Sequence, residues 1–384
     1  MNVVIAGAGQ GGFQTALSLR SEGYDGTITL IGDEPHLPYQ RPPLSKGFLA
    51  GKQAIDSATL RPESFYATQR IERIAHDPVV EIDRAARRVK LRSGTRVGYE
   101  KLVLATGARV RKLPGSGIFY LRTRDDAIEL KQRLEDAAEV AVIGGGFIGL
   151  EVASAASALG KSVTVFELQD RLMPRCVSPV ISEFYGRLHS SHGVRIVLGG
   201  AAVPPRADLT IAGIGVLPNL ELARDAGLPV ANGISVDDRL RTADLDIFAI
   251  GDSAEHPNLF AGSRVRLESV QNAVDQAKIA AANIVGRDEP YRAVPWFWTD
   301  QFDVKLQMAG LSGGADREAI RGSLEGRKFS VFYFRGAQLI AVDSINRPGD
   351  HLIARKLLAS GTSLTPEHAS DESLDLKSLG DAPR

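Results

Sequence analysis

Glycines recur at one spacing, G-x-G-x-x-G, in two places: residues 7–12 (GAGQGG) and residues 144–149 (GGGFIG). At this spacing the first glycine permits a tight turn, the second lets a pyrophosphate approach the backbone, and the third lets a helix pack closely on a strand. Unpaired N–H groups at the start of the following helix then face the phosphates. Two such clusters indicate two sites for a dinucleotide.

Each glycine cluster lies between a short apolar strand and a helical pattern. Strands at residues 3–6 and 139–143 precede the clusters, and second strands at residues 27–32 and 162–166 follow the helices. Asp33 and Glu167 come at the ends of the second strands, where a carboxylate accepts hydrogen bonds from ribose hydroxyls. One G-x-G-x-x-G is weak evidence, but its recurrence in this context favours two dinucleotide-binding folds over two unrelated α/β turns.

Composition excludes several classes of function. The chain has 384 residues, 43% hydrophobic and 24% charged, which is typical of a globular protein of two or three domains. Lys+Arg and Asp+Glu both number 46, and this balance argues against binding to nucleic acid. Residues 140–160 are long enough for a membrane span but contain Glu151 and a glycine-rich turn. We expect a cytoplasmic protein that binds no membrane.

The single cysteine, Cys176, excludes a disulfide framework, a Cys-rich zinc site and an intrachain redox dithiol. We interpret it as a small core or surface residue. The seven histidines form no cluster of ligands, and His189 and His192 are expected at the surface. We therefore predict no metal site.

Two further turns, residues 102–107 (LVLATG) and 247–252 (IFAIGD), each follow a short apolar strand. With the two glycine clusters, they make the sequence resemble the flavoprotein reductases that contain two dinucleotide-binding domains. The resemblance implies an α/β fold with two Rossmann-like domains, one for FAD and one for NAD, and a C-terminal α+β domain. It implies these boundaries: an FAD domain of residues 1–109 and 233–294, an inserted NAD domain of residues 110–232 that is shortened around 198–208, and a C-terminal reductase domain of residues 295–384.

Residues 36–48 (HLPYQRPPLSKGF) identify the branch, because the thiol-dependent branches carry a cysteine there and this chain has none. The segment is similar to the signature of the oxygenase-coupled, NADH-dependent ferredoxin reductases. The resemblance continues at residues 121–123, 213–219, 268–273 and 294–301. It implies FAD as the cofactor, NADH as the co-substrate, and transient binding of a 2Fe–2S ferredoxin. That ferredoxin serves a bacterial Rieske dioxygenase or cytochrome P450, in pathways such as aromatic hydrocarbon catabolism. A monomer and a homodimer both stay open.

The same resemblance implies roles for single residues. The FAD contacts are Gly7, Gly9, Gly11, Gly12, Asp33, Arg41, Lys46, Val79, Ala105, Thr106, Gly107, Arg122, Asp252, Val270 and Trp298. The NAD contacts are Gly144, Gly146, Phe147, Ile148, Gly149, Glu167 and Gly215. The residues implied at the site of hydride transfer are Lys46, Glu151 and Pro43, with Lys46 and Glu151 paired across two domains.

Simpler interpretations of these charges compete with the functional ones. Lys46 could be a solvated loop lysine, and Glu151 an acid in the first helical turn that the helix dipole stabilises. Glu167 would repel the 2′-phosphate of NADPH, since two unit charges about 4 Å apart cost roughly 4 kcal/mol at an effective dielectric constant near 20. NADH is therefore favoured, although Arg171 and Arg175 could weaken the discrimination.

Several regions leave alternatives open. The basic residues 84–96 are interpreted as a solvated face, and Lys278 as a better candidate for ferredoxin docking. Trp296 and Trp298 share one face of a strand and either pack in the core or lie near the flavin and the docking face. Further strands are expected at residues 304–308, 329–334 and 338–342, with a helix at 352–358.

Two other functions compete with ferredoxin reduction. The first is an NAD(P)H reductase or oxidase of the same fold that acts on a small acceptor. The second is a redox-sensing flavoprotein similar to apoptosis-inducing factors.

Overall fold

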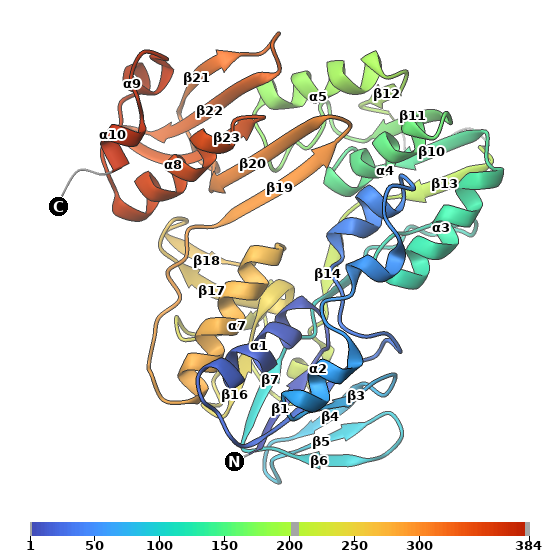
Figure 1. Ribbon diagram of the computed structural model, residues 1–384, viewed down its shortest axis with the longest axis vertical. Helices are drawn as coiled ribbons and strands as arrows, with labels where there is room; N and C mark the ends of the chain where they lie inside the picture. Colours follow the sequence, from blue (N-terminus) through green and yellow to red (C-terminus); the bar gives the residue numbers. More distant parts are fainter. Residues whose placement is uncertain (1, 201–206, 381–384) are drawn as a thin grey trace. The chain divides into compact units, whose positions relative to one another are not determined.

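The computed structural model describes residues 2–200 and 207–380 (Figure 1). The chain forms two compact units. Unit 1 comprises Met1–Gln40, Thr59–Arg109 and Leu217–Ala293, and unit 2 comprises Arg41–Ala58, Val110–Val216 and Val294–Arg384. The division into three domains stays a prediction. Part of residues 198–208, where the NAD domain is predicted to be shortened, lies outside the described residues.

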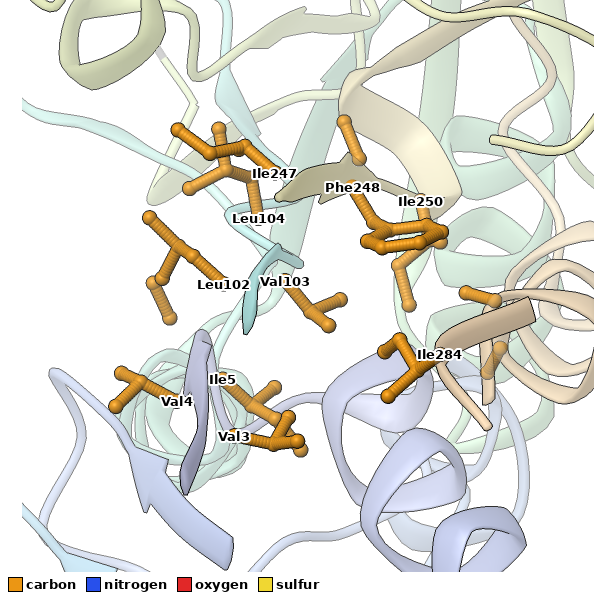
Figure 2. Packing of buried hydrophobic residues seen from close by; sticks show 14 of the residues in the cluster. Val3, Val4, Ile5, Leu102, Val103, Leu104, Ile247, Phe248, Ile250 and Ile284 are labelled. Carbon is orange, nitrogen blue, oxygen red and sulfur yellow. The ribbon is translucent and has the colours of Figure 1, made fainter. Parts of the chain in front are cut away.

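The core of unit 1 is a sheet of five parallel strands in the order β16-β7-β1-β2-β3. Strands buried on both faces consist of continuous apolar residues, and Val3, Val4 and Ile5 of β1 are fully buried. Figure 2 shows them in one cluster with side chains of β7, which pairs with β1, and of β16, which pairs with β7. The strands are β1 (Asn2–Ala6), β2 (Thr27–Ile31), β3 (Ile71–Ile74), β7 (Lys101–Leu104) and β16 (Ile247–Ala249).

Helices α1 and α7 pack against each other in unit 1 (Figure 1). Two small sheets complete this unit, β4-β5-β6 and β15-β17-β18. The helices are α1 (Gln10–Ser21), α2 (Glu63–Thr68), α6 (Glu221–Asp225), η3 (Gly251–Ser253) and α7 (Val270–Ile284). The short strands are β4 (Val79–Asp83), β5 (Arg88–Leu91), β6 (Arg96–Gly98), β15 (Ile234–Ser235), β17 (Ala254–Asn258) and β18 (Ser263–Val265).

Unit 2 contains a second parallel sheet, in the order β12-β11-β10-β13-β9. Its strands are β9 (Ile118–Phe119), β10 (Glu139–Ile143), β11 (Ser162–Glu167), β12 (Arg195–Leu198) and β13 (Leu209–Ala212). Its helices are α3 (Arg124–Asp136), α4 (Phe147–Ala158) and α5 (Pro179–Ser191), and two helical turns, η1 (Leu44–Phe48) and η2 (Ile55–Ala58), precede them in the chain. The chain passes from unit 1 to unit 2 within β8 (Ala108–Val110) and returns within β14 (Val216–Pro218).

A third sheet of five strands, all antiparallel, follows in unit 2, in the order β19-β20-β23-β22-β21. Helix α8 packs on β20 and β23, and α9 packs on β21 (Figure 1). The sequence predicted β20, β22, β23 and α8, but not the charged edge strand β21. The elements are β19 (Trp296–Gln301), β20 (Val304–Gly310), β21 (Arg317–Ser323), β22 (Lys328–Arg335), β23 (Gln338–Ile345), α8 (Pro348–Ser360), α9 (Pro366–Ser370) and α10 (Lys377–Gly380).

The predicted fold class is confirmed: two parallel α/β sheets and a C-terminal sheet with helices. Among the described residues, no helix has both the length and the apolar character needed to cross a membrane.

Asp343, on β23, is a buried carboxyl group whose charge state should govern the pH dependence of stability. It is 1% exposed, and its Oδ2 accepts a hydrogen bond from the Tyr333 hydroxyl at 2.7 Å. Burial raises the pKa of Asp343 from 3.8 to about 7. Between these two pKa values the folded state holds a proton that the unfolded chain releases. The stability that Asp343 contributes is therefore fully present below about pH 4 and is lost as the pH rises through about 7.

We therefore expect the free energy of unfolding of Asp343→Asn, taken relative to that of the parent protein, to be about 2 kcal/mol higher at pH 8 than at pH 5. Urea unfolding at the two pH values measures this difference. Asp136→Asn, at an exposed position on α3, is the control and should show none. An equal free-energy difference between Asp343→Asn and the parent protein at both pH values would contradict the assignment.

Candidate functional site

The glycine turn of unit 1 combines close packing at its ends with open space at its middle. Gly7 has φ +121°, and a Cβ there would lie 2.1 Å from the Ala105 oxygen. A Cβ at Gly12 would lie 1.8 Å from the Gly7 oxygen, so neither position admits a side chain. Apart from Gly9 and its two chain neighbours, no atom of the described residues lies within 4 Å of a Cβ at Gly9. The turn therefore fits a pyrophosphate that contacts the backbone at the middle glycine.

The glycine turn of unit 2 has the same construction. Gly144 has φ +103°, and a Cβ at Gly149 would lie 2.0 Å from the Gly144 oxygen. At Gly146 the nearest atom to a Cβ is the Gly213 oxygen, 3.9 Å away. Gly9 and Gly146 are the N-caps of α1 and α4, and no side chain caps either helix. The N–H groups at both helix starts therefore suit an anionic ligand.

The turn at residues 105–107 is held by Asn219, which the sequence did not single out as a site residue. The Asn219 amide nitrogen donates to the Thr106 oxygen at 2.8 Å, and Thr106 Oγ1 donates to the Asn219 oxygen at 2.9 Å. The Asn219 N–H donates to the Gly107 oxygen at 3.0 Å. A similar role falls to Gln276 of α7, whose Oε1 accepts from the Gly251 N–H at 2.7 Å beside Asp252.

The predicted FAD contacts are divided between the two units. Most of those in unit 1 come just after its parallel strands, while Val79 begins β4 and Val270 begins α7. The unit 1 contacts are Gly7, Gly9, Gly11, Gly12, Asp33, Val79, Ala105, Thr106, Gly107, Asp252 and Val270. Four others belong to unit 2: Arg41, Lys46, Arg122 and Trp298. The structure brings two of these together, since Arg41 Nη1 donates to the Arg122 oxygen at 2.5 Å. Asp33 is exposed just after β2.

Glu151 is the centre of a buried polar cluster in unit 2. It is 3% exposed and forms an ion pair with Lys46 through Oε1. Thr299 Oγ1 also donates to Oε1, at 2.6 Å, and Ser45 Oγ donates to Oε2 at 2.5 Å. Donors on both oxygens compensate for burial of the carboxylate and restrict it to one orientation. The predicted contact between Lys46 and Glu151 is present, whereas Ser45 and Thr299 were missed.

The backbone around Lys46 explains how the lysine reaches Glu151. Pro43 has φ −60° and ψ −25° and starts the wide helical turn η1. Within this turn Lys46 departs from helical geometry, with φ −113° and ψ −108°. Its side chain is only 18% exposed, so it is not the solvated loop lysine of the simpler interpretation.

One expectation about this pair is corrected. Glu151 is the fifth residue of α4, so it lies beyond the first helical turn, which contains no acid. The helix dipole therefore explains little of its placement, because that effect fades within one turn. Residues 41–58 cluster in unit 2 with Glu151, and the assignment of the pair to two different domains stays a prediction.

Glu167 ends β11 and fixes the glycine turn of the second sheet. Its Oε2 accepts from the Gly145 N–H at 2.7 Å, and its Oε1 accepts from the Gln169 N–H at 2.9 Å. Arg171 donates to the oxygens of Val177 and Pro174, so its guanidinium is engaged within its own loop. Arg171 is thus a poor candidate for weakening the preference for NADH.

The remaining predicted NAD residues lie around the same turn. Phe147 and Ile148 begin the first turn of α4, and Ile148 is 44% exposed. Gly215 follows β13 with φ +94°, and a Cβ there would lie 3.7 Å from Arg175 Nη2. Arg175, unlike Arg171, thus remains beside a predicted NAD residue.

Strand β19 carries different side chains on its two faces. Trp296 and Trp298 share one face, as predicted, with ring centroids 5.5 Å apart. Trp296 also contacts two residues of α8, His351 and Arg355, so its packing role is clear. Thr299, on the opposite face, points toward α4 through its bond to Glu151.

His189 is not at the surface, and the expectation to the contrary is wrong. It is fully buried on α5, and its Nε2 lies 2.8 Å from Gln301 Oε1. Burial lowers its pKa to about 4. Ile181 and Tyr185 precede His189 at four-residue intervals and are also fully buried, so the helical periodicity contained this signal. His192 is exposed, as expected.

The basic stretch at residues 84–96 behaves as a solvated face. Arg84 pairs with Asp244 at 2.9 Å, and Arg87 pairs with Asp246 at 2.5 Å. Lys278 is exposed on α7. No group of His, Cys, Asp and Glu side chains suited to a metal ion is found in the described part of the chain.

Two parallel sheets, each with an open glycine turn between a strand and the helix that follows it, define an oxidoreductase fold with two dinucleotide-binding regions. The chain belongs to the pyridine nucleotide-disulphide oxidoreductase family, whose model matches residues 1–203 and 205–277. A model described as Reductase C-terminal matches residues 296–380. The predicted family resemblance is thereby confirmed.

Known proteins are similar over nearly the whole chain. Rhodocoxin reductase of Rhodococcus erythropolis is 48% identical, covering 98% of this chain and 94% of the relative. The crystal structure of the ferredoxin reductase for the CYP199A2 system from Rhodopseudomonas palustris has a TM-score of 0.95 at 47% identity, covering 99% of both chains. The reductase in the covalent putidaredoxin reductase–putidaredoxin complex has a TM-score of 0.95 at 39% identity, covering 98% of this chain and 97% of that one.

Proposed function

We propose that the protein is an FAD-dependent reductase that takes electrons from NADH and passes them to a ferredoxin. The observation that carries the proposal is the pair of glycine turns, each closed at its ends and open at its middle glycine. Membership of the family and similarity to ferredoxin reductases along the whole chain support the direction of electron flow. A thiol relay is excluded because Cys176 is the only cysteine.

The cofactors supply the hydride and electron chemistry when they are bound, and the chain supplies binding and alignment. The glycine turn of unit 1 and its neighbouring turns would hold FAD, and that of unit 2 would hold NADH. Lys46 of η1 and Glu151, the fifth residue of α4, form a net-neutral and largely buried pair. Such a pair holds two charged groups in fixed positions and excludes water from them, which favours a single alignment of the reactants.

The partner is proposed to be a 2Fe–2S ferredoxin that binds transiently and serves a cytochrome P450 or a Rieske dioxygenase. A ferredoxin partner is supported by the solved complex of a related reductase with putidaredoxin. We place the protein in the cytoplasm, where NADH is available, as a monomer or homodimer.

The shortened NAD domain also remains part of the proposal. The family model is interrupted at residue 204, and the alignment with rhodocoxin reductase extends over 400 positions against 384 residues in this chain. The relative therefore has residues that this chain lacks, and residues 198–208 are the proposed place.

Glu167→Gln should reduce the preference for NADH over NADPH. The side chain keeps its size but loses the charge that opposes a 2′-phosphate, so we expect the ratio of kcat/KM values to fall by about a hundredfold. Steady-state kinetics with both nucleotides measure the ratio. Glu183→Gln, at an exposed position on α5, is the control. A ratio unchanged in Glu167→Gln would show that the carboxylate does not face the ribose.

The function itself is tested with purified protein, NADH and a 2Fe–2S ferredoxin under anaerobic conditions. Ferredoxin reduction that depends on both NADH and the protein is the expected result. Rapid NADH oxidation with oxygen but none with ferredoxin would favour the small-acceptor oxidase. Slow flavin reduction with a long-lived complex of flavin and nicotinamide would favour the redox sensor.

A further inference from the structure

Thr299 joins the C-terminal sheet to the helix that carries Glu151. It is fully buried on β19 and donates to Glu151 Oε1 at 2.6 Å. Two residues earlier, the Phe297 ring lies 4.8 Å from the Phe147 ring, centroid to centroid. Residues two apart on a strand share a face, as do residues four apart on a helix. One face of β19 is therefore in register with one face of α4.

A line of buried polar groups continues behind Thr299. Gln301 Nε2 lies 3.3 Å from Thr299 Oγ1, and Gln301 Oε1 lies 2.8 Å from His189 Nε2. Thr299, Gln301 and His189 are all fully buried. Since unpaired buried polar groups are costly, a line of this kind persists only when its members satisfy one another.

The directions of these hydrogen bonds follow from the chemistry of the groups. Glu151, paired with Lys46, is an acceptor only, so Thr299 must donate its hydroxyl proton to it. The Thr299 oxygen then accepts from the Gln301 amide nitrogen, and the Gln301 oxygen accepts from His189. His189 must therefore carry its proton on Nε2.

The other ring nitrogen of His189 agrees with this assignment. Nδ1 is buried and has no hydrogen-bond partner among the described residues, as expected of a bare lone pair. The lowered pKa keeps the ring neutral near pH 7. Each hydrogen bond of the line from His189 to Glu151 thereby joins a donor to an acceptor.

We propose that Thr299 is a positioning residue for hydride transfer. Gln301 and His189 orient its hydroxyl, and the hydroxyl holds the Glu151 carboxylate in the orientation that pairs with Lys46. Ser45, which lies beside Lys46 in η1, donates to the second carboxylate oxygen of Glu151 and fixes it. The C-terminal sheet thus sets the geometry of a charge pair formed by residues far earlier in the sequence. The effect on the rate of hydride transfer rests on the proposed function, whereas the hydrogen-bond assignment does not.

The direction of the hydrogen bonds is tested without any cofactor. The ¹⁵N NMR shifts of the His189 ring in the FAD-free chain at pH 7 report which nitrogen carries the proton, and His189→Gln assigns the signals. The expected result is a neutral ring protonated on Nε2. A ring protonated on Nδ1 alone would overturn the proposal, because Nε2 would then accept a hydrogen bond and Gln301 would turn its amide nitrogen away from Thr299 and toward His189.

The catalytic consequence is tested by stopped-flow reduction of the FAD-loaded protein with NADH. Thr299→Val keeps the shape of the side chain but removes the hydroxyl, and we expect the rate of flavin reduction to fall roughly ten- to hundredfold. Thr299→Ser restores the hydroxyl and should recover most of the rate. Thr210→Val, on β13, is the matched control and should be unaffected.

The outcomes separate this inference from the proposed function. Equal rates for Thr299→Val and the parent protein would overturn the positioning role while leaving the reductase intact. Failure of Thr299→Ser to exceed the valine variant would also overturn it, because packing and not the hydroxyl would then matter. No reduction of the parent protein by NADH would instead contradict the proposed function, and the His189 measurement would still decide the hydrogen-bond assignment.

Discussion

Glu151→Gln is expected to slow the reduction of bound FAD by NADH by about a hundredfold, the scale on which a small misplacement of reacting groups acts. The amide removes the charge that balances Lys46, whose side chain is largely buried. It also brings N–H donors to positions where Ser45 and Thr299 already donate. The lysine then leaves the site or remains there uncompensated, and either result disturbs the alignment of the two cofactors.

Anaerobic stopped-flow spectroscopy measures this rate, and the FAD content of each preparation is measured alongside it. FAD content should be unchanged, since the substitution leaves the glycine turn of unit 1 intact, and most of the predicted FAD contacts lie in that unit. Glu129→Gln, at an exposed position on α3, is the control and should keep the parent rate. If the Glu151→Gln protein is reduced as fast as its parent, the Lys46–Glu151 pair does not align the reactants for hydride transfer.

Gly12→Ala is expected to abolish FAD binding and to lower the free energy of unfolding by about 3 kcal/mol or more. A Cβ at this position would lie 1.8 Å from the Gly7 oxygen, so the backbone of the turn must move. That movement displaces the start of α1, where N–H groups would face the pyrophosphate. Absorbance of the purified protein reports its FAD content, and urea unfolding of the FAD-free chain reports its stability.

Gly186→Ala provides the matched control, because it makes the same chemical change inside another helix. Apart from its chain neighbours and the backbone of its own helix, no atom of the described part of the chain lies within 4 Å of a Cβ at Gly186. Alanine is favoured over glycine within a helix, so this variant should be more stable by about 0.5–1 kcal/mol and should keep its FAD. Equal FAD content in the Gly12→Ala and Gly186→Ala proteins would contradict the assignment of the first glycine turn.

Local sequence patterns were enough to predict the dinucleotide-binding regions. An apolar strand, a glycine turn, a helix and a second strand ending in an acid occupy one continuous stretch of chain. The geometry of Gly7, Gly12, Gly144 and Glu167 follows directly from that stretch. The shared face of Trp296 and Trp298 on β19 could be predicted for the same reason, because residues two apart on a strand point to the same side.

The partners of Glu151 could not be predicted in this way. Ser45 and Thr299 reach it from segments more than a hundred residues away, and only tertiary packing brings β19 onto α4. The lysine that pairs with Glu151 was inferred from family resemblance and not from spacing. His189 was wrongly placed at the surface because no acid or cysteine accompanied it as a co-ligand, although it continues the buried stripe of Ile181 and Tyr185 on α5.

The central claim is that this chain binds FAD and that NADH reduces it. The most direct measurement is the visible spectrum of the purified protein during anaerobic titration with NADH, and in parallel with NADPH. The account predicts flavin absorption that NADH bleaches rapidly and NADPH bleaches slowly. Equal bleaching by both nucleotides would contradict the role of Glu167, and a protein with no flavin after reconstitution with FAD would contradict the account as a whole.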